Sequence, residues 1–140
     1  MKDGAKPRTP FIVLKRQVLC RMANAIEDKS FEFAVRIVRL SQYLNSEKKE
    51  YVMSKQILKC GTSIGANVAE AQQAQSYADF IAKIGIASKE AQETYYWIRL
   101  LARTGYITPR MSRSLLSDCN ELIRLLTSIL NTAKNKQSVR

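Results

Sequence analysis

The chain has 140 residues, of which 46% are hydrophobic and 25% are charged, and its formal net charge is +11. This composition excludes a disordered or low-complexity chain and indicates one soluble domain with its own core. The positive charge favours a polyanion such as nucleic acid as the partner, with a role in solubility alone as the alternative explanation.

The residue types that several common chemistries need are missing. The chain contains no histidine, which removes the usual general base, the Ser-His and Cys-His nucleophile pairs and the Glu-x-x-His ligands of ferritin-like metal sites. It has no glycine motif for phosphate or dinucleotide binding. We therefore expect a protein that is not an enzyme and has no cofactor, no metal and no small-molecule substrate.

The cysteines and the apolar runs indicate a compartment. Cys20, Cys60 and Cys119 lack zinc-site spacing, and Cys60 and Cys119 fall on apolar stripes, so we expect them to be small core residues in a reducing environment. The early apolar run at residues 11–14 is too short for a signal peptide or a membrane anchor. We expect a cytoplasmic protein that does not contact a membrane.

Residues 1–27 are predicted to form a flexible basic arm, because they contain two of the three prolines and no sustained apolar period. At most one helical turn is expected there, near Val18. Met22 stands where the regular pattern begins and is a candidate for the native start. Residues 28–135 are predicted to form a four-helix bundle, followed by a basic tail at residues 136–140.

Four apolar stripes with alternating steps of three and four residues predict the helices, the first of which is expected from Ser30 to about Asn45. The stripes are Phe33, Ile37, Leu40 and Leu44; Met53, Ile57, Cys60, Ile64, Asn67, Ala71 and Ala74; Tyr77, Phe80, Ile84, Ala87, Ala91, Thr94, Ile98 and Leu101; and Leu115, Cys119, Leu122, Leu126, Ile129 and Ala133. Ser76 is predicted to cap the third helix and Gly105 to end it. Short connections between such helices are typical of an all-α, up-down-up-down antiparallel four-helix bundle.

The second helix carries two glycines and an asparagine. Gly61 and Gly65 are four residues apart, and because glycine in a helix costs about 1 kcal/mol relative to alanine, we expect a neighbouring helix to approach closely there. Asn67 lies on the predicted seam, where an unpaired amide costs about 1–3 kcal/mol. We expect it to pair with Thr94, Ser88 or a backbone carbonyl and to fix the register of the helices, with a ligand contact as the alternative.

Carboxylates and aromatic rings share one face of the third helix. Glu90 and Glu93 lie there with Trp97, and we expect them to accept hydrogen bonds at a helix interface, with solvated positions as the alternative. Tyr95, Tyr96 and Trp97 cannot all face the core, so an exposed ring is expected to anchor an interface. The predicted structural or interface residues are Gly61, Gly65, Asn67, Glu70, Glu90, Glu93 and Trp97. Whether Asn67 and Glu70 face the core or a neighbouring subunit stays open.

Basic residues recur in pairs at helical spacing. Each pair alone is typical of a solvated face, but repetition in an oligomer would turn the pairs into a positive belt. Arg110, Arg113 and Arg124 add charge to the fourth helix. The residues predicted to contact nucleic acid are Arg36, Arg39, Lys55, Lys59, Arg99 and Arg103.

The segment "SKQILKCGTSIGANVAEAQQAQSYADFIAKIGIASKEAQETYYWIRLL", residues 54–101, carries a family resemblance. The Ser63–Asn67 run, Glu70, Ser76, Asp79-Phe80 and Glu90-x-x-Glu93 occur in it in order. The segment resembles the four-helix-bundle family of 23S rRNA intervening-sequence proteins, which includes the accessory variability proteins of diversity-generating retroelements. The resemblance extends more weakly over residues 29–135, and Lys59-Cys60 stands where Arg-Ser is expected.

The resemblance implies a positively charged bundle that assembles as a ring, typically a homopentamer. Retroelement members bind nucleic acid and the reverse transcriptase of the element, so it also implies these partners. Our leading hypothesis is a non-enzymatic homo-oligomer that binds RNA or DNA through the phosphates. The alternative is a protein-interaction adaptor that docks a reverse transcriptase or another partner, without significant nucleic-acid binding of its own.

Overall fold

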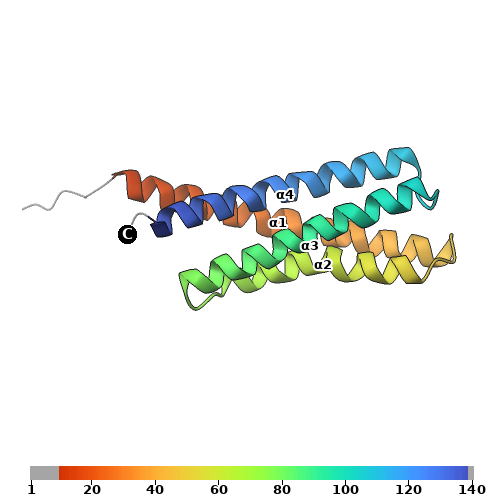
Figure 1. The fold of residues 1–140 in the computed structure, drawn as a ribbon, viewed down its shortest axis with the longest axis horizontal. Coiled ribbons are helices and arrows are strands. Elements are labelled where there is room, and N and C mark those ends of the chain that lie inside the picture. Colours follow the sequence, from red (N-terminus) through yellow and green to blue (C-terminus); the bar gives the residue numbers. More distant parts are fainter. Residues whose placement is uncertain (1–9, 139–140) are drawn as a thin grey trace, which may run out of the picture.

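The computed structural model describes residues 10–138. Within this range there is no strand, and four α-helices pack side by side: α1 (Pro10–Ser46), α2 (Val52–Gln72), α3 (Tyr77–Arg103) and α4 (Pro109–Ser138). α2 packs against α1 and α3, and α4 packs against α3 and α1. The α1–α2 and α3–α4 connections lie at one end of the molecule, and the α2–α3 connection lies at the other (Figure 1). The prediction of an all-α protein with four helices is confirmed.

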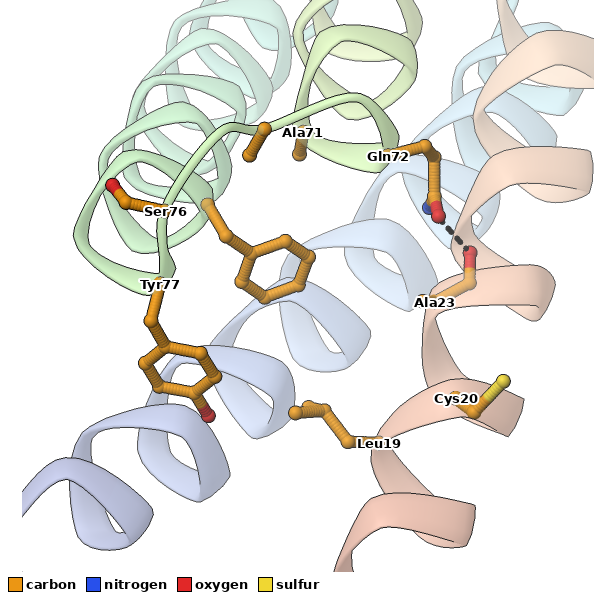
Figure 2. A pocket seen from close by; sticks show the side chains of 9 residues that line it. Leu19, Cys20, Ala23, Ala71, Gln72, Ser76 and Tyr77 are labelled. Carbon is orange, nitrogen blue, oxygen red and sulfur yellow. Dashed lines mark hydrogen bonds between the residues drawn. The ribbon is translucent and has the colours of Figure 1, made fainter.

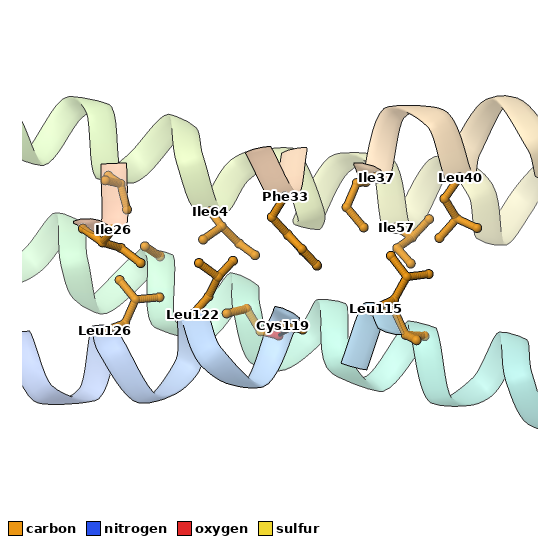
Figure 3. Packing of buried hydrophobic residues seen from close by; sticks show 14 of the residues in the cluster. Ile26, Phe33, Ile37, Leu40, Ile57, Ile64, Leu115, Cys119, Leu122 and Leu126 are labelled. Carbon is orange, nitrogen blue, oxygen red and sulfur yellow. Dashed lines mark hydrogen bonds between the residues drawn. The ribbon is translucent and has the colours of Figure 1, made fainter. Parts of the chain in front are cut away.

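Aliphatic side chains from all four helices fill the centre of the bundle (Figure 3). The α3 stripe is buried from Ile84 to Leu101, and the α4 stripe is buried from Leu115 to Ala133, as predicted. Cys60 is buried with them, and so is Cys119. Burial of one Leu or Ile side chain contributes roughly 1.5–3 kcal/mol, so this shared core is the main source of stability.

α1 begins at Pro10, so the prediction that the first helix starts at Ser30 is wrong. The helix extends upstream because its buried face extends upstream. Ile26 is fully buried, and Leu19 and Met22 pack against the core at helical spacing. Proline is also well tolerated in the first turn of a helix, where a missing N–H costs no hydrogen bond.

The predicted boundaries of the arm and the tail change accordingly. Residues 10–27 are helical and do not form the predicted flexible arm, and α4 continues to Ser138, inside the predicted tail. Residues 1–9 and 139–140 lie outside the described residues.

The buried stripe of α2 passes through Val68 and not through Asn67, so the predicted seam position is wrong. The next buried residue after Ile64 is Val68, four positions later, because a helix with 3.6 residues per turn drifts away from a strict heptad pattern. Asn67 is only half-buried, and its amide donates to the Ser63 carbonyl oxygen of its own helix at 2.8 Å. A backbone carbonyl is therefore its partner, but not one that fixes the register of α2 against α3.

Gly61 and Gly65 allow α1 to approach α2. A Cβ atom on Gly61 would lie 2.7 Å from Cγ2 of Ile37, and one on Gly65 would lie 3.3 Å from the Ser30 carbonyl oxygen. The first distance is shorter than carbon atoms tolerate, and Ile37 is fully buried. The two glycines thus set the distance between these helices.

Both ends of α3 follow the local rules of helix termini. The Ser76 hydroxyl accepts a hydrogen bond from the Asp79 N–H at 3.0 Å, as predicted for a cap. Gly105 has a φ of 83°, and the N–H groups of Gly105 and Tyr106 donate back to Ala102 and Leu101. This C-terminal motif ends α3 and turns the chain sharply towards α4.

The upstream part of α1 lies beside the α2–α3 connection (Figure 2). The Gln72 side-chain amide donates to the Ala23 carbonyl oxygen at 3.2 Å, across one side of a pocket of about 420 Å³. None of the pocket-lining residues is charged. Among the described residues, no helix has the length and apolar content that a bilayer crossing requires.

Candidate nucleic-acid interface

The six predicted contact residues lie on three helices in different surroundings. Each of α1, α2 and α3 holds two of them: Arg36 and Arg39, Lys55 and Lys59, and Arg99 and Arg103, respectively. All but Arg36 are exposed. The six residues therefore do not share one set of neighbours.

Arg36 is already engaged by α4. Its Nη1 donates to Oδ2 of Asp118 at 2.6 Å, and its Nη2 donates to Oγ of Ser114 at 3.0 Å. Because this charge-assisted hydrogen bond is short, the guanidinium would have to give up its contact with Asp118 in order to bind a phosphate. Arg36 thus connects α1 to α4 and is not a free cation of the candidate interface.

Lys59 lies in an acidic neighbourhood. Burial raises the pKa of Glu90 and the nearby Glu93 carboxylate raises it further, while the Lys59 charge opposes both effects.

Oε2 of Glu93 accepts a hydrogen bond from Nε1 of Trp97 at 3.1 Å, within α3. Glu93 is thus a hydrogen-bond acceptor, as expected, but for its own helix and not for a neighbouring one.

Glu70 forms an ion pair between α2 and α3. Its Oε1 lies 3.0 Å from Nζ of Lys83, and this contact raises the pKa of the lysine. Both side chains are at least partly exposed, so the pair adds little to stability. The charges of Glu70 and Lys83 neutralise each other at this part of the surface.

Arg99 and Arg103 differ from the other candidates, because a groove of about 520 Å³ runs beside them between α3 and α4. Leu100, Ala102 and Leu116 supply half-buried apolar side chains to it. The groove is lined by Tyr96, Arg99, Leu100, Ala102, Arg103, Pro109, Ser112 and Leu116, and we call it the arginine groove. Within residues 10–138 neither arginine forms an ion pair, so both guanidinium groups are available to an anion.

The aromatic ring of Tyr96 stands at this groove with 56% of the residue exposed. It meets Trp97 edge to face, with ring centroids 5.2 Å apart and an interplanar angle of 77°. Trp97 is held in turn by its hydrogen bond to Glu93. The exposed ring that the Tyr95–Trp97 run predicts is therefore that of Tyr96, in an orientation supported by its neighbours.

The start of α4 adds further positive charge beside the groove. The Thr108 hydroxyl accepts a hydrogen bond from the Met111 N–H at 3.1 Å and caps the helix. Arg110 and Arg113 are exposed in its first turns, next to the groove-lining residues Pro109 and Ser112. The predicted contact set left these two arginines out, and they do not line the groove itself.

A sequence signal for this site was present. Residues 94–117 contain Arg99, Arg103, Arg110 and Arg113 but no aspartate or glutamate. The spacing within one helix identifies the pair Arg99 and Arg103. The larger group, which adds Arg110 and Arg113, is recognised only from the absence of acidic residues on both sides of the α3–α4 connection. The short α3–α4 connection brings the end of α3, which carries Arg99 and Arg103, close to the start of α4, which carries Arg110 and Arg113 (Figure 1).

The fold and this site define a small basic protein of four packed helices with an arginine-lined groove. The chain belongs to the 23S rRNA-intervening sequence protein family, whose family model matches residues 23–128. The chain is 58% identical to a protein of unknown function from the S23 ribosomal protein family of Bacteroides thetaiotaomicron VPI-5482, whose crystal structure superposes with a TM-score of 0.78. That match covers 79% of this chain and 98% of the Bacteroides chain. No curated protein matches the chain.

Proposed function

We propose that this protein is a non-enzymatic nucleic-acid-binding protein that works as a homo-oligomer. In this proposal the subunit is an up-down-up-down bundle, and the arginine groove holds RNA or DNA by its phosphates without reading base sequence. The observation that carries the proposal is the pair of uncompensated guanidinium groups of Arg99 and Arg103 in an acid-free stretch. Arginine binds phosphate through two parallel N–H donors, which suits backbone recognition.

Self-association into a ring, and a homopentamer in particular, is the second part of the proposal. It is supported by apolar side chains that one subunit leaves uncovered. Phe31 is 65% exposed, and Val38, two turns further along the same face of α1, is exposed as well. In a ring, the arginine groove would be repeated once per subunit. One nucleic-acid strand could then contact several grooves, and the high effective concentration would raise the overall affinity above that of a single groove.

Exposed aromatic side chains favour the second candidate function, a protein-interaction adaptor that docks a reverse transcriptase or another protein. Exposed aromatic rings are common anchors of protein interfaces, and Tyr51 and Tyr96 are both more than half exposed. In this case the positive charge steers the partner and does not hold nucleic acid.

The test combines light scattering with a salt titration of binding to labelled RNA and DNA of mixed sequence. We expect a particle of several chain masses and an affinity that falls linearly with salt on a double-logarithmic plot. Arg99→Gln/Arg103→Gln should reduce the slope by about 1.4 per engaged groove on single strands, since each neutralised phosphate contributes about 0.7.

The matched control removes the same charge elsewhere on α3 and α4. Lys89→Gln/Lys134→Gln affects two exposed lysines without ion pairs among the described residues, and its salt slope should stay closer to that of the unmodified protein. Equal slopes for the two double variants would assign binding to net charge alone. An oligomer that binds neither RNA nor DNA at low salt would leave the adaptor as the better explanation.

A further inference from the structure

We propose that the arginine groove accommodates an unpaired nucleotide, with its base stacked on Tyr96, so that the protein prefers single-stranded to double-stranded nucleic acid. This inference rests on the proposed function and adds the class of nucleic acid that the groove takes. Three features of the groove carry it: its apolar lining, its exposed ring and the spacing of its charges.

The lining of the groove suits a base better than a phosphate. Leu100, Ala102 and Leu116 present carbon atoms, and the volume of about 520 Å³ is within the range of small-ligand sites. A groove that bound only phosphates would gain nothing from this apolar surface. A duplex keeps its bases stacked inside and presents its phosphates outward, so it would leave the apolar lining unused.

Tyr96 supplies the stacking surface. More than half of the residue is exposed, and the edge-to-face contact with Trp97 limits the orientations that the ring can adopt. Stacking on a ring that is already oriented costs little conformational entropy, and it tolerates any base because every base has a flat face. Tyr96 thus fits binding without sequence preference.

The positive charges continue the row that Tyr96 begins. Arg99 lies three residues beyond Tyr96, and Arg103 lies four residues beyond Arg99, so the three side chains follow one face of α3. At a rise of 1.5 Å per residue this row spans about 10 Å. A base at Tyr96 then leaves both guanidinium groups beside the backbone of the same strand.

An apolar peptide with acidic side chains would meet a similar surface, so the experiment has to separate bases from charge. The probes are a fluorescein-labelled 12-nucleotide DNA strand of mixed sequence, the same strand with abasic sites throughout, and the same sequence as a duplex. The strand and its abasic form carry equal phosphate charge and differ only in the presence of bases. Binding is measured by fluorescence anisotropy on the full chain at low salt.

We expect the unmodified protein to bind the strand more tightly than its abasic form or the duplex. Tyr96→Ala should weaken binding to the strand about 5- to 150-fold, which is the range for one stacked base, and should leave binding to the abasic form unchanged. Tyr96→Phe keeps the stacking surface and should retain the affinity. Arg99→Gln/Arg103→Gln should weaken binding to both forms alike.

Tyr51→Ala is the matched control, because Tyr51 is 53% exposed but does not line the groove. It should bind all three probes as the unmodified protein does. Trp97 is the single tryptophan of the chain and contacts Tyr96, so a base on Tyr96 should also quench its fluorescence. The abasic strand should not cause this quenching.

Equal affinity for the strand and its abasic form would overturn the inference, and so would duplex binding as tight as that of the strand. In either case, a loss of binding in Arg99→Gln/Arg103→Gln would keep the proposed function intact. If the unmodified protein binds none of the three probes and also fails to bind an RNA strand of the same sequence, the proposed function itself fails. The two failures are therefore distinguishable from one set of titrations.

Discussion

At the scale of single residues, two helical glycines of this bundle differ in the space that surrounds them. A Cβ atom on Gly61 would meet the buried Ile37 side chain at 2.7 Å, whereas one on Gly85 would meet no atom within 4 Å. Both positions are helical, so alanine gains about the same helix propensity at each, roughly 1 kcal/mol. Only the packing against the neighbouring helix differs, which makes the two positions a matched pair.

We expect Gly61→Ala to lower the free energy of unfolding by up to about 2 kcal/mol, because overpacking costs about 1–3 kcal/mol and the gain in helix propensity offsets about 1 kcal/mol of that cost. Gly85→Ala should raise it by about 0.5–1 kcal/mol. Urea unfolding followed by circular dichroism measures both changes. If Gly61→Ala stabilised the protein as much as Gly85→Ala, the close approach of α1 to α2 would not depend on Gly61.

At the scale of elements, α1 is the helix whose extent differs most from its prediction. The part upstream of Ser30 contributes Ile26 to the core, at 0% exposure. An arm without fixed structure would contribute nothing to stability. The cost of removing the Ile26 side chain therefore measures whether this part of α1 belongs to the cooperative fold.

Ile26→Ala should lower the free energy of unfolding by about 2–4 kcal/mol, the usual cost of truncating a fully buried isoleucine. Val18→Ala, also upstream of Ser30, should change it by less than about 0.5 kcal/mol, because Val18 is exposed. Thermal or urea unfolding of the two variants gives the comparison. A cost for Ile26→Ala no larger than that for Val18→Ala would argue against a packed α1 upstream of Ser30.

At the scale of the whole molecule, two buried thiols couple stability to pH. Burial raises the pKa of Cys60 to about 11 and that of Cys119 to about 12, from an ordinary value of 9.0. The Thr94 hydroxyl donates to Sγ of Cys60, which opposes part of the increase, and Sγ of Cys119 donates to the Ala91 carbonyl oxygen. The folded protein thus holds both thiol protons more tightly than the unfolded chain does.

Stability should consequently fall between about pH 9 and pH 11. In this window the unfolded chain has lost thiol protons that the folded chain retains, so each thiol lowers the free energy of unfolding by about 1.4 kcal/mol per pH unit. Cys119→Ala removes one of the two contributions and should make the decline shallower by that amount. Urea unfolding at several pH values measures the slopes, and an unchanged slope would contradict the role of this thiol.

The sequence alone determined the features that depend on short-range chemistry. The stripes of α3 and α4 follow from helical periodicity, the cap at Ser76 and the turn at Gly105 follow from local backbone preferences, and the charge of +11 follows from composition. Each of these needs only neighbours within a few residues. They were enough to predict four helices and the faces by which α3 and α4 pack.

Only the tertiary structure decided which charges are compensated and where a groove forms. Arg36 and Arg99 each belong to an arginine pair at helical spacing, so the sequence does not distinguish them. The partner of Arg36, Asp118, lies 82 residues away on another helix. A period of 3.6 residues per turn allows either Asn67 or Val68 to follow Ile64 on the buried stripe, and the packed structure buries Val68. Non-local pairs set these outcomes, because a helix fixes the direction of its side chains but not the identity of the surface that they meet.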